Sequence, residues 1–124
     1  MAKIIIIPNE ENLILDFKFY SPQQFFYTVT ILNNSTGQII SKSKGQWDGK
    51  TSFLLGKAKD LSGSLLTIDW TISDPAGAGN KFNAEAIVNQ NNIDCKEHQT
   101  CTGTTNNTIT HYPTSGTFIN LMKD

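Results

Sequence analysis

Residues 64–90 read SLLTIDWTISDPAGAGNKFNAEAIVNQ, and the polarity pattern of this stretch decides the fold class. In its first half, apolar residues recur at every second position: Leu66, Ile68, Trp70 and Ile72. After the Gly/Pro-rich residues 74–80 they do so again: Phe82, Ala84, Ala86 and Val88. A period of two is typical of a strand with one buried and one wet face. The stretch therefore predicts two amphipathic strands joined by a turn and paired antiparallel.

The same kind of pattern extends over the rest of the chain. Residues 13–20 and 25–32 alternate, and shorter runs at 3–7, 38–42, 51–58, 108–112 and 116–122 are compatible with strands. Turn-forming residues separate them, including 45–49 and 113–115, and the polar residues 89–107 read as one long loop. No segment shows a convincing helical period. We predict an all-β, single-domain antiparallel β-sandwich over residues 1–124, jelly-roll or immunoglobulin-like, with eight or nine short strands.

Composition narrows the choice of partners. A chain of 124 residues is long enough to bury a core, and its formal net charge of −1 favours no highly charged partner. All ten basic residues are lysines. Sequence-specific readers of nucleic acid rely on the planar fork of arginine, so we expect no nucleic-acid partner.

The N-terminus supplies only four isoleucines before Pro8, and two acids follow at Glu10 and Glu11. A secretory signal needs a longer apolar region, and no run reaches the length of a membrane-spanning helix. The sequence predicts a soluble protein without a visible leader, and it leaves the compartment open.

Two cysteines and two histidines lie in the last third of the chain: Cys95, His98, Cys101 and His111. Two thiolates and two imidazoles are a legitimate zinc set, but the spacing matches no common zinc motif. A local disulfide between Cys95 and Cys101 is the favoured interpretation, and two free thiols are the alternative. We predict neither a metal nor another cofactor.

An enzymatic function is not predicted. His98 and His111 are the only imidazole bases, and neither lies in a catalytic signature. Asp69 and Glu85 fall on the wet faces of the predicted pair of strands, where we expect solvated charges rather than a pair of catalytic carboxylates.

The leading hypothesis is a non-enzymatic, lectin-like binding module for a glycan. Sugar sites combine a flat aromatic face with amide and carboxylate side chains that match hydroxyl groups. The residues that offer this chemistry in predicted turns and loops are Gln46, Trp47, Asp48, Asn91, Asn92 and Tyr112. For Trp47, an aromatic plug at one end of the sandwich is the alternative.

Two other hypotheses stay open. A membrane-interacting, toxin-like sandwich is the first, because Tyr20, Phe25, Phe26 and Tyr27 flank a predicted turn and could form an interfacial aromatic cluster. A self-assembling structural protein is the second, with a homo-oligomer formed through an exposed apolar patch.

Overall fold

The computed structural model describes residues 2–46 and 51–120, which form ten strands and one four-residue helix. Their bounds are β1 (Ala2–Ile6), β2 (Asn12–Phe19), β3 (Gln24–Leu32), β4 (Ile39–Gln46), β5 (Ser52–Lys57), α1 (Ala58–Leu61), β6 (Leu65–Ser73), β7 (Lys81–Gln90), β8 (Ile93–Asp94), β9 (Gln99–Thr104) and β10 (Ile109–Asn120). The helix was not expected from the sequence.

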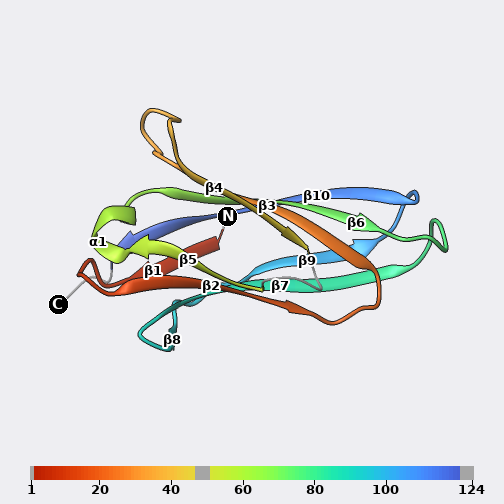
Figure 1. Cartoon of the computed structure of the whole chain (residues 1–124), viewed down its shortest axis with the longest axis horizontal. Coiled ribbons are helices and arrows are strands. Elements are labelled where there is room, and N and C mark those ends of the chain that lie inside the picture. The colour runs from red at the N-terminus through yellow and green to blue at the C-terminus, as the bar shows by residue number, and fades with distance from the viewer. Residues whose placement is uncertain (1, 47–50, 121–124) are drawn as a thin grey trace.

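The strands form two packed sheets, so the predicted all-β sandwich is confirmed (Figure 1). Sheet A has the order β1-β10-β6-β3-β4. Sheet B has the order β5-β2-β7, and both β8 and β9 pair with the remaining edge of β7. The neighbours run antiparallel except for β1 and β10, which are parallel and so depart from the expected arrangement.

The predicted pairing of residues 64–90 within one sheet is wrong. β6 pairs with β3 and β10 in sheet A, whereas β7 pairs with β2 in sheet B. The turn at residues 74–80 therefore crosses between the sheets. The buried positions of both strands are nevertheless as predicted: Leu66, Ile68, Trp70, Ile72, Phe82, Ala84, Ala86 and Val88. Alternation reports which face of a strand is buried, and it says nothing about which strand lies beside it.

Aromatic rings join the two sheets in the core. Phe17 of β2 stacks on Tyr27 of β3 with ring centroids 4.0 Å apart, and it meets Trp70 of β6 edge-on at 5.3 Å. Gly45 of β4 allows this packing, because a Cβ there would lie 2.6 Å from the Tyr27 ring. Burial of each large apolar side chain stabilises the fold by roughly 1.5–3 kcal/mol.

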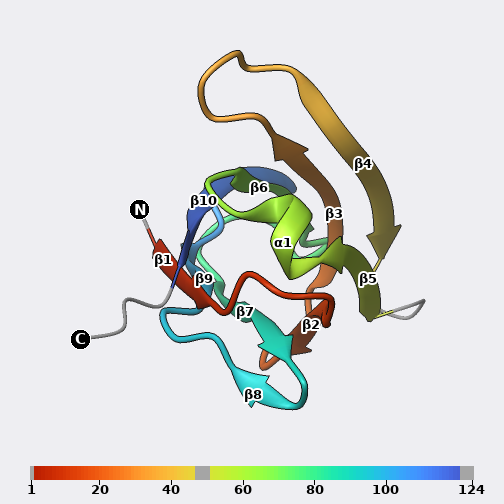
Figure 2. The ribbon, with the colours of Figure 1, turned by 90° about the vertical axis from the view of Figure 1, so that its left-hand side faces the viewer.

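β1 closes one side of the sandwich (Figure 2). One of its edges pairs with β10 of sheet A. On the other edge, Ile5 N donates to Cys95 O at 2.7 Å. The Gln90 side chain continues this link, since its Oε1 accepts from Ile7 N at 2.9 Å and its Nε2 donates to Ile7 O at 2.8 Å.

The prediction of one long loop at residues 89–107 is wrong, because this segment contains the end of β7 and the edge strands β8 and β9. Asn91 and Asn92 have φ angles of 51° and 62° and form the two-residue turn that links β7 to β8. Asparagine tolerates this left-handed conformation, and two such residues give the turn that fits a hairpin best. The Asn-Asn pair was the sequence signal for this hairpin.

A single strand, β10, replaces the two strands predicted around residues 113–115. Phe118 N donates to Ser64 O, so even-numbered residues of β10 point their amides toward β6. By alternation, Pro113 points its nitrogen the other way, where β1 begins to pair only at Gly116. Proline is tolerated there because no partner strand needs its missing N–H.

Candidate functional site

A polar hollow of about 430 Å³ lies on the outer face of sheet B. It is lined by Ile14 and Asp16 of β2, Ser52 of β5, Asn89 of β7 and Asn92 of the β7–β8 turn. Three neighbouring strands and one turn thus contribute a carboxylate, two amides, a hydroxyl and an aliphatic side chain. We call these five residues the polar hollow.

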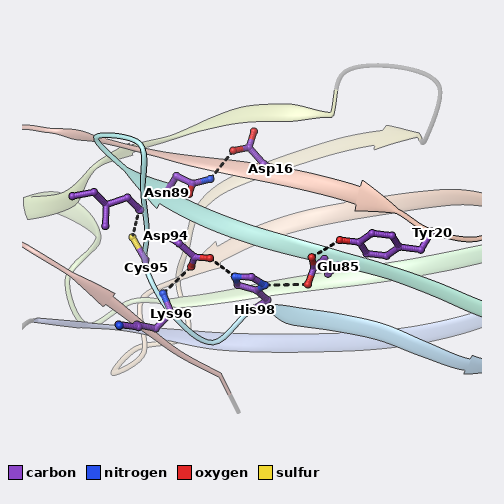
Figure 3. A network of polar contacts seen from close by, with 9 residues as sticks. Asp16, Tyr20, Glu85, Asn89, Asp94, Cys95, Lys96 and His98 are labelled. Carbon is purple, nitrogen blue, oxygen red and sulfur yellow. Dashed lines mark hydrogen bonds and ion pairs between the residues drawn. The ribbon is translucent and has the colours of Figure 1, made fainter.

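Asp16 is the centre of the polar hollow because donors from both neighbouring strands hold its carboxylate. Asn89 Nδ2 donates to Asp16 Oδ2 at 2.7 Å, as Figure 3 shows, and Ser52 Oγ donates to Asp16 Oδ1 at 2.8 Å. Each carboxylate oxygen has a second lone pair that can accept another hydrogen bond. The side chain is therefore fixed in place and still able to bind hydroxyl groups.

A second polar network lies beside the polar hollow on the same face (Figure 3). Tyr20 Oη donates to Glu85 Oε1 at 2.6 Å, and His98 Nδ1 lies 3.0 Å from Glu85 Oε2. The other ring nitrogen of His98 contacts Asp94 Oδ2, and Asp94 Oδ1 accepts from Lys96 N at 2.9 Å. His98 thus joins β7 to the end of β8.

These contacts shift the pKa values of the groups involved. The hydrogen bond to Glu85 raises the pKa of Tyr20, and the same bond, with help from His98, lowers the pKa of Glu85 against the effect of partial burial. Burial acts to lower the pKa of His98, but the hydrogen bonds to Asp94 and Glu85 outweigh it and raise that pKa. The network favours a charged His98 between two carboxylates.

The structure separates the residues predicted to bind a ligand. Asn92 lines the polar hollow, whereas Gln46 ends β4 in sheet A. Tyr112 is half-buried on the inward row of β10, and its ring meets Phe82 at 5.9 Å, so it packs against the core. Asn91 is exposed in the β7–β8 turn, next to Asn92. Trp47 and Asp48 lie outside the described residues.

Asp16, Ser52 and Asn89 are site residues that sequence reasoning missed. Alternation placed Asp16 and Asn89 on wet faces, which is the only signal the sequence offered. Their proximity depends on the pairing of β2 with β5 and β7, which no local pattern reports.

The expected disulfide is not formed, because Cys95 and Cys101 are free, buried thiols. Cys95 N donates to Val88 O, whereas Cys101 pairs with Ala84, four residues away along β7. Four residues of strand span about 13 Å, well beyond disulfide reach. Burial raises the pKa of Cys95 to about 11 and that of Cys101 to about 12, so both are poor nucleophiles.

A separate groove of about 560 Å³, the seam groove, lies between β9 and the part of β10 that β1 does not cover. It is lined by Ala2, Thr67, Asp69, His98, Gln99, Thr100, Pro113, Thr114 and Ser115. In its wall, Trp70 Nε1 donates to Thr114 Oγ1 at 2.8 Å, and Thr114 Oγ1 donates to buried Gln99 Oε1 at 2.7 Å. We attribute a structural function to this relay, because it links the two sheets through satisfied polar groups.

The aromatic cluster expected of a membrane-binding protein is not assembled. Phe25 and Tyr27 are buried in the core, while Tyr20, just after β2, and Phe26, on β3, are exposed. Within residues 2–46 and 51–120, no helix has the length and apolar character needed to cross a bilayer.

Residues 2–46 and 51–120 contain no group of three or more His, Cys, Asp and Glu side chains placed to hold a metal ion.

Comparisons with protein-family models, curated proteins and solved structures found no match for this chain.

Proposed function

We propose that the protein is a non-enzymatic binding module that takes a carbohydrate in the polar hollow. The observation that carries this proposal is the Asp16 carboxylate, which Asn89 and Ser52 hold in place on an accessible face. A site whose polar groups are already oriented binds without the entropic cost of ordering them.

The chemistry of the polar hollow matches neighbouring sugar hydroxyls. A carboxylate accepts hydrogen bonds from hydroxyl hydrogens, and amide groups both donate and accept. Asp16 supplies the carboxylate acceptor, and Asn89 and Asn92 supply the amides that both donate and accept. Ile14 adds an aliphatic surface of the kind that packs against the C–H groups of a sugar ring. The polar hollow carries no charge apart from the Asp16 carboxylate, which suits an uncharged glycan.

Trp47 remains the predicted aromatic platform for this ligand, with Asp48 beside it in the sequence. It follows Gln46, the last residue of β4, and precedes Ser52 of the polar hollow by five positions in the sequence. A stacking contact from Trp47 would complete the combination of aromatic face and polar side chains.

A glycan array tests the proposal. We expect the wild-type protein to bind at least one glycan, and we expect Asp16→Asn to lose that signal. Asn keeps the size of Asp but replaces one acceptor oxygen with a donor. Asp69→Asn is the matched control because Asp69 is an exposed acid on the outer face of sheet A, and it should keep the signal.

The outcome that contradicts this site is equal loss of binding in both variants, or no loss in Asp16→Asn. No binding to a broad array would remove the carbohydrate proposal itself. Trp47→Ala tests the aromatic platform separately: the signal should fall while the circular dichroism spectrum keeps its β-sheet character.

Self-association is a second candidate, favoured by β4. This strand is the last one of sheet A, and Ile39 and Ile40 at its start are 56% and 47% exposed. An edge strand with exposed apolar residues can pair with a second copy, although Lys42 and Lys44 oppose this by charge. Size-exclusion chromatography with light scattering should show a dimer that Ile39→Lys dissociates. A strict monomer at high micromolar concentration would contradict the candidate.

A further inference from the structure

The edge strand of sheet B is interrupted between β8 and β9 by a bulge. Asn89 pairs with Asp94, and Ala86 pairs with Gln99. Between these pairs β7 supplies two residues and the edge strand supplies four, so two residues are extra. Lys96 takes a φ of 72° there, a conformation that costs a non-glycine residue energy and needs support from its surroundings. We call residues 94–98 the bulge.

The bulge lies opposite Ile87 and Val88, the two β7 residues between the paired positions Ala86 and Asn89. Ile87 points to the outer face of β7 by alternation, yet it is only 6% exposed. His98 closes the bulge, since its ring contacts Asp94 at one end and Glu85 of β7 at the other. Figure 3 shows the ring between the two carboxylates.

The proton content of His98 decides whether both contacts can exist together. A neutral imidazole has one N–H and one lone pair, so it can donate to only one of two carboxylates. The second carboxylate would then face the lone pair of the other nitrogen, which is repulsive. The charged form donates to both carboxylates. Closure of the bulge therefore requires a proton on the ring, or one on a carboxylate that faces it.

The charged groups around His98 favour its charged form. Glu85 and Asp94 contact the His98 ring directly. Asp69 lines the seam groove together with His98. Tyr20 donates a hydrogen bond to Glu85 without adding charge. Of the cations, Lys18 of β2 acts on Glu85, and the Lys96 backbone amide, which carries no charge, donates to Asp94. Carboxylates thus dominate the immediate surroundings, consistent with the raised pKa of His98.

We propose that the bulge is a pH-operated clasp, which His98 holds closed when protonated and releases when it loses its proton. The clasp is coupled to the polar hollow, because Asp94 pairs with Asn89, and the two-residue turn that leads into β8 carries Asn92. Release loosens this wall of the hollow, so ligand binding weakens as the pH rises. The coupling to a ligand rests on the proposed function, whereas the clasp itself does not.

Amide hydrogen exchange measured by NMR tests the clasp without any ligand. The reporters are the Cys95 amide, bonded to Val88 O, and the Lys96 amide, bonded to Asp94 Oδ1. After correction for the intrinsic exchange rate, their protection should fall about tenfold or more as the pH rises from about 5 to about 9, the equivalent of one lost charge-assisted hydrogen bond.

Two variants and one control make this result specific. In His98→Gln the protection should be low and independent of pH, because glutamine does not titrate. In Asp94→Asn the midpoint of the His98 ring-proton titration should fall below that of the wild type, because one carboxylate is gone. His111→Gln changes the other histidine, which lies on sheet A, and should leave the transition intact. Protection that does not change with pH in the wild type, or changes equally in His98→Gln, overturns the clasp.

Repeating the glycan array at about pH 6 and about pH 8.5 tests the coupling. The wild-type signal should be weaker at the higher pH, and His98→Gln should lose this dependence. A wild-type signal that is equal at both pH values overturns the coupling. An array without any signal contradicts the proposed function, while the exchange experiment still decides the clasp.

Discussion

Asp16 and Asp69 occupy comparable places in the two sheets but have different surroundings. Both lie on the outer face of a strand that is paired on both sides. Asp16 accepts hydrogen bonds from Ser52 and Asn89. Across the part of the chain that the structure describes, Asp69 makes no side-chain hydrogen bond or ion pair.

The difference arises from the residues on the neighbouring strands. Ser52 lies directly opposite Asp16, and Asn89 reaches it from β7. Asp69 has Thr28 on one side, whose hydroxyl forms no hydrogen bond with it, and Pro113, whose side chain has no donor, on the other. A wet-face carboxylate becomes part of a built site only where donors on the adjacent strands form hydrogen bonds with it. Four experiments test this contrast, beginning with the largest expected effect.

Trp70→Ala tests whether the inner face of sheet A is tightly packed, so that the contrast between Asp16 and Asp69 concerns only the outer faces. Trp70 is 1% exposed and donates a hydrogen bond to Thr114, so its loss should lower the free energy of unfolding by about 3–5 kcal/mol. Urea denaturation followed by circular dichroism measures this. A loss below about 1 kcal/mol would show that the inner face of sheet A is not the tightly packed core described above.

Asp16→Ala and Asp69→Ala compare the two acids directly. Removing Asp16 leaves two donors without their acceptor, so we expect a loss of about 1–2 kcal/mol in the free energy of unfolding. Removing Asp69 should change it by less than about 0.5 kcal/mol, as for an ordinary exposed side chain. The same denaturation experiment reports both values, and equal values would abolish the contrast.

A double-mutant cycle isolates the contact between Asp16 and Asn89. The variants are Asp16→Ala, Asn89→Ala and the pair together, and the coupling free energy should be at least about 0.5 kcal/mol. Additive effects would mean that the contact contributes nothing measurable. The corresponding cycle on Asp69 and Thr28 should be additive, because their side chains share no hydrogen bond.

The pH dependence of stability should come from sheet B. Because His98 has a raised pKa in the folded protein, its contribution is complete below its ordinary value of about 6.5 and is lost as the pH rises through the raised value. Glu85 has a lowered pKa and acts in the opposite sense, with its contribution lost under acid conditions. Urea midpoints measured across this range should therefore decline toward alkaline pH in the wild type and not in His98→Gln. If the urea midpoint of His98→Gln declines in the same way, a group other than His98 causes the pH dependence.

The sequence predicted the buried faces of β2, β3, β6 and β7 because alternation is a local property. The alternating apolar residues of these strands, which include Leu15, Val29, Ile68 and Ala84, lie in the core as expected. The site was beyond such reasoning, since Asp16 and Asn89 are 73 residues apart and meet only through the pairing of β2 with β7. The continuity of β10 through Pro113 was also beyond it, because tolerance of that proline depends on where β1 begins.

An NMR titration of the protein with the strongest glycan of the array tests the central claim most directly. The account predicts that backbone amide shifts change at Asp16, Ser52, Asn89 and Asn92, while those of Thr28, Asp69 and the rest of the outer face of sheet A stay in place. Shift changes centred on the outer face of sheet A or on the seam groove, with the polar hollow unaffected, would contradict it.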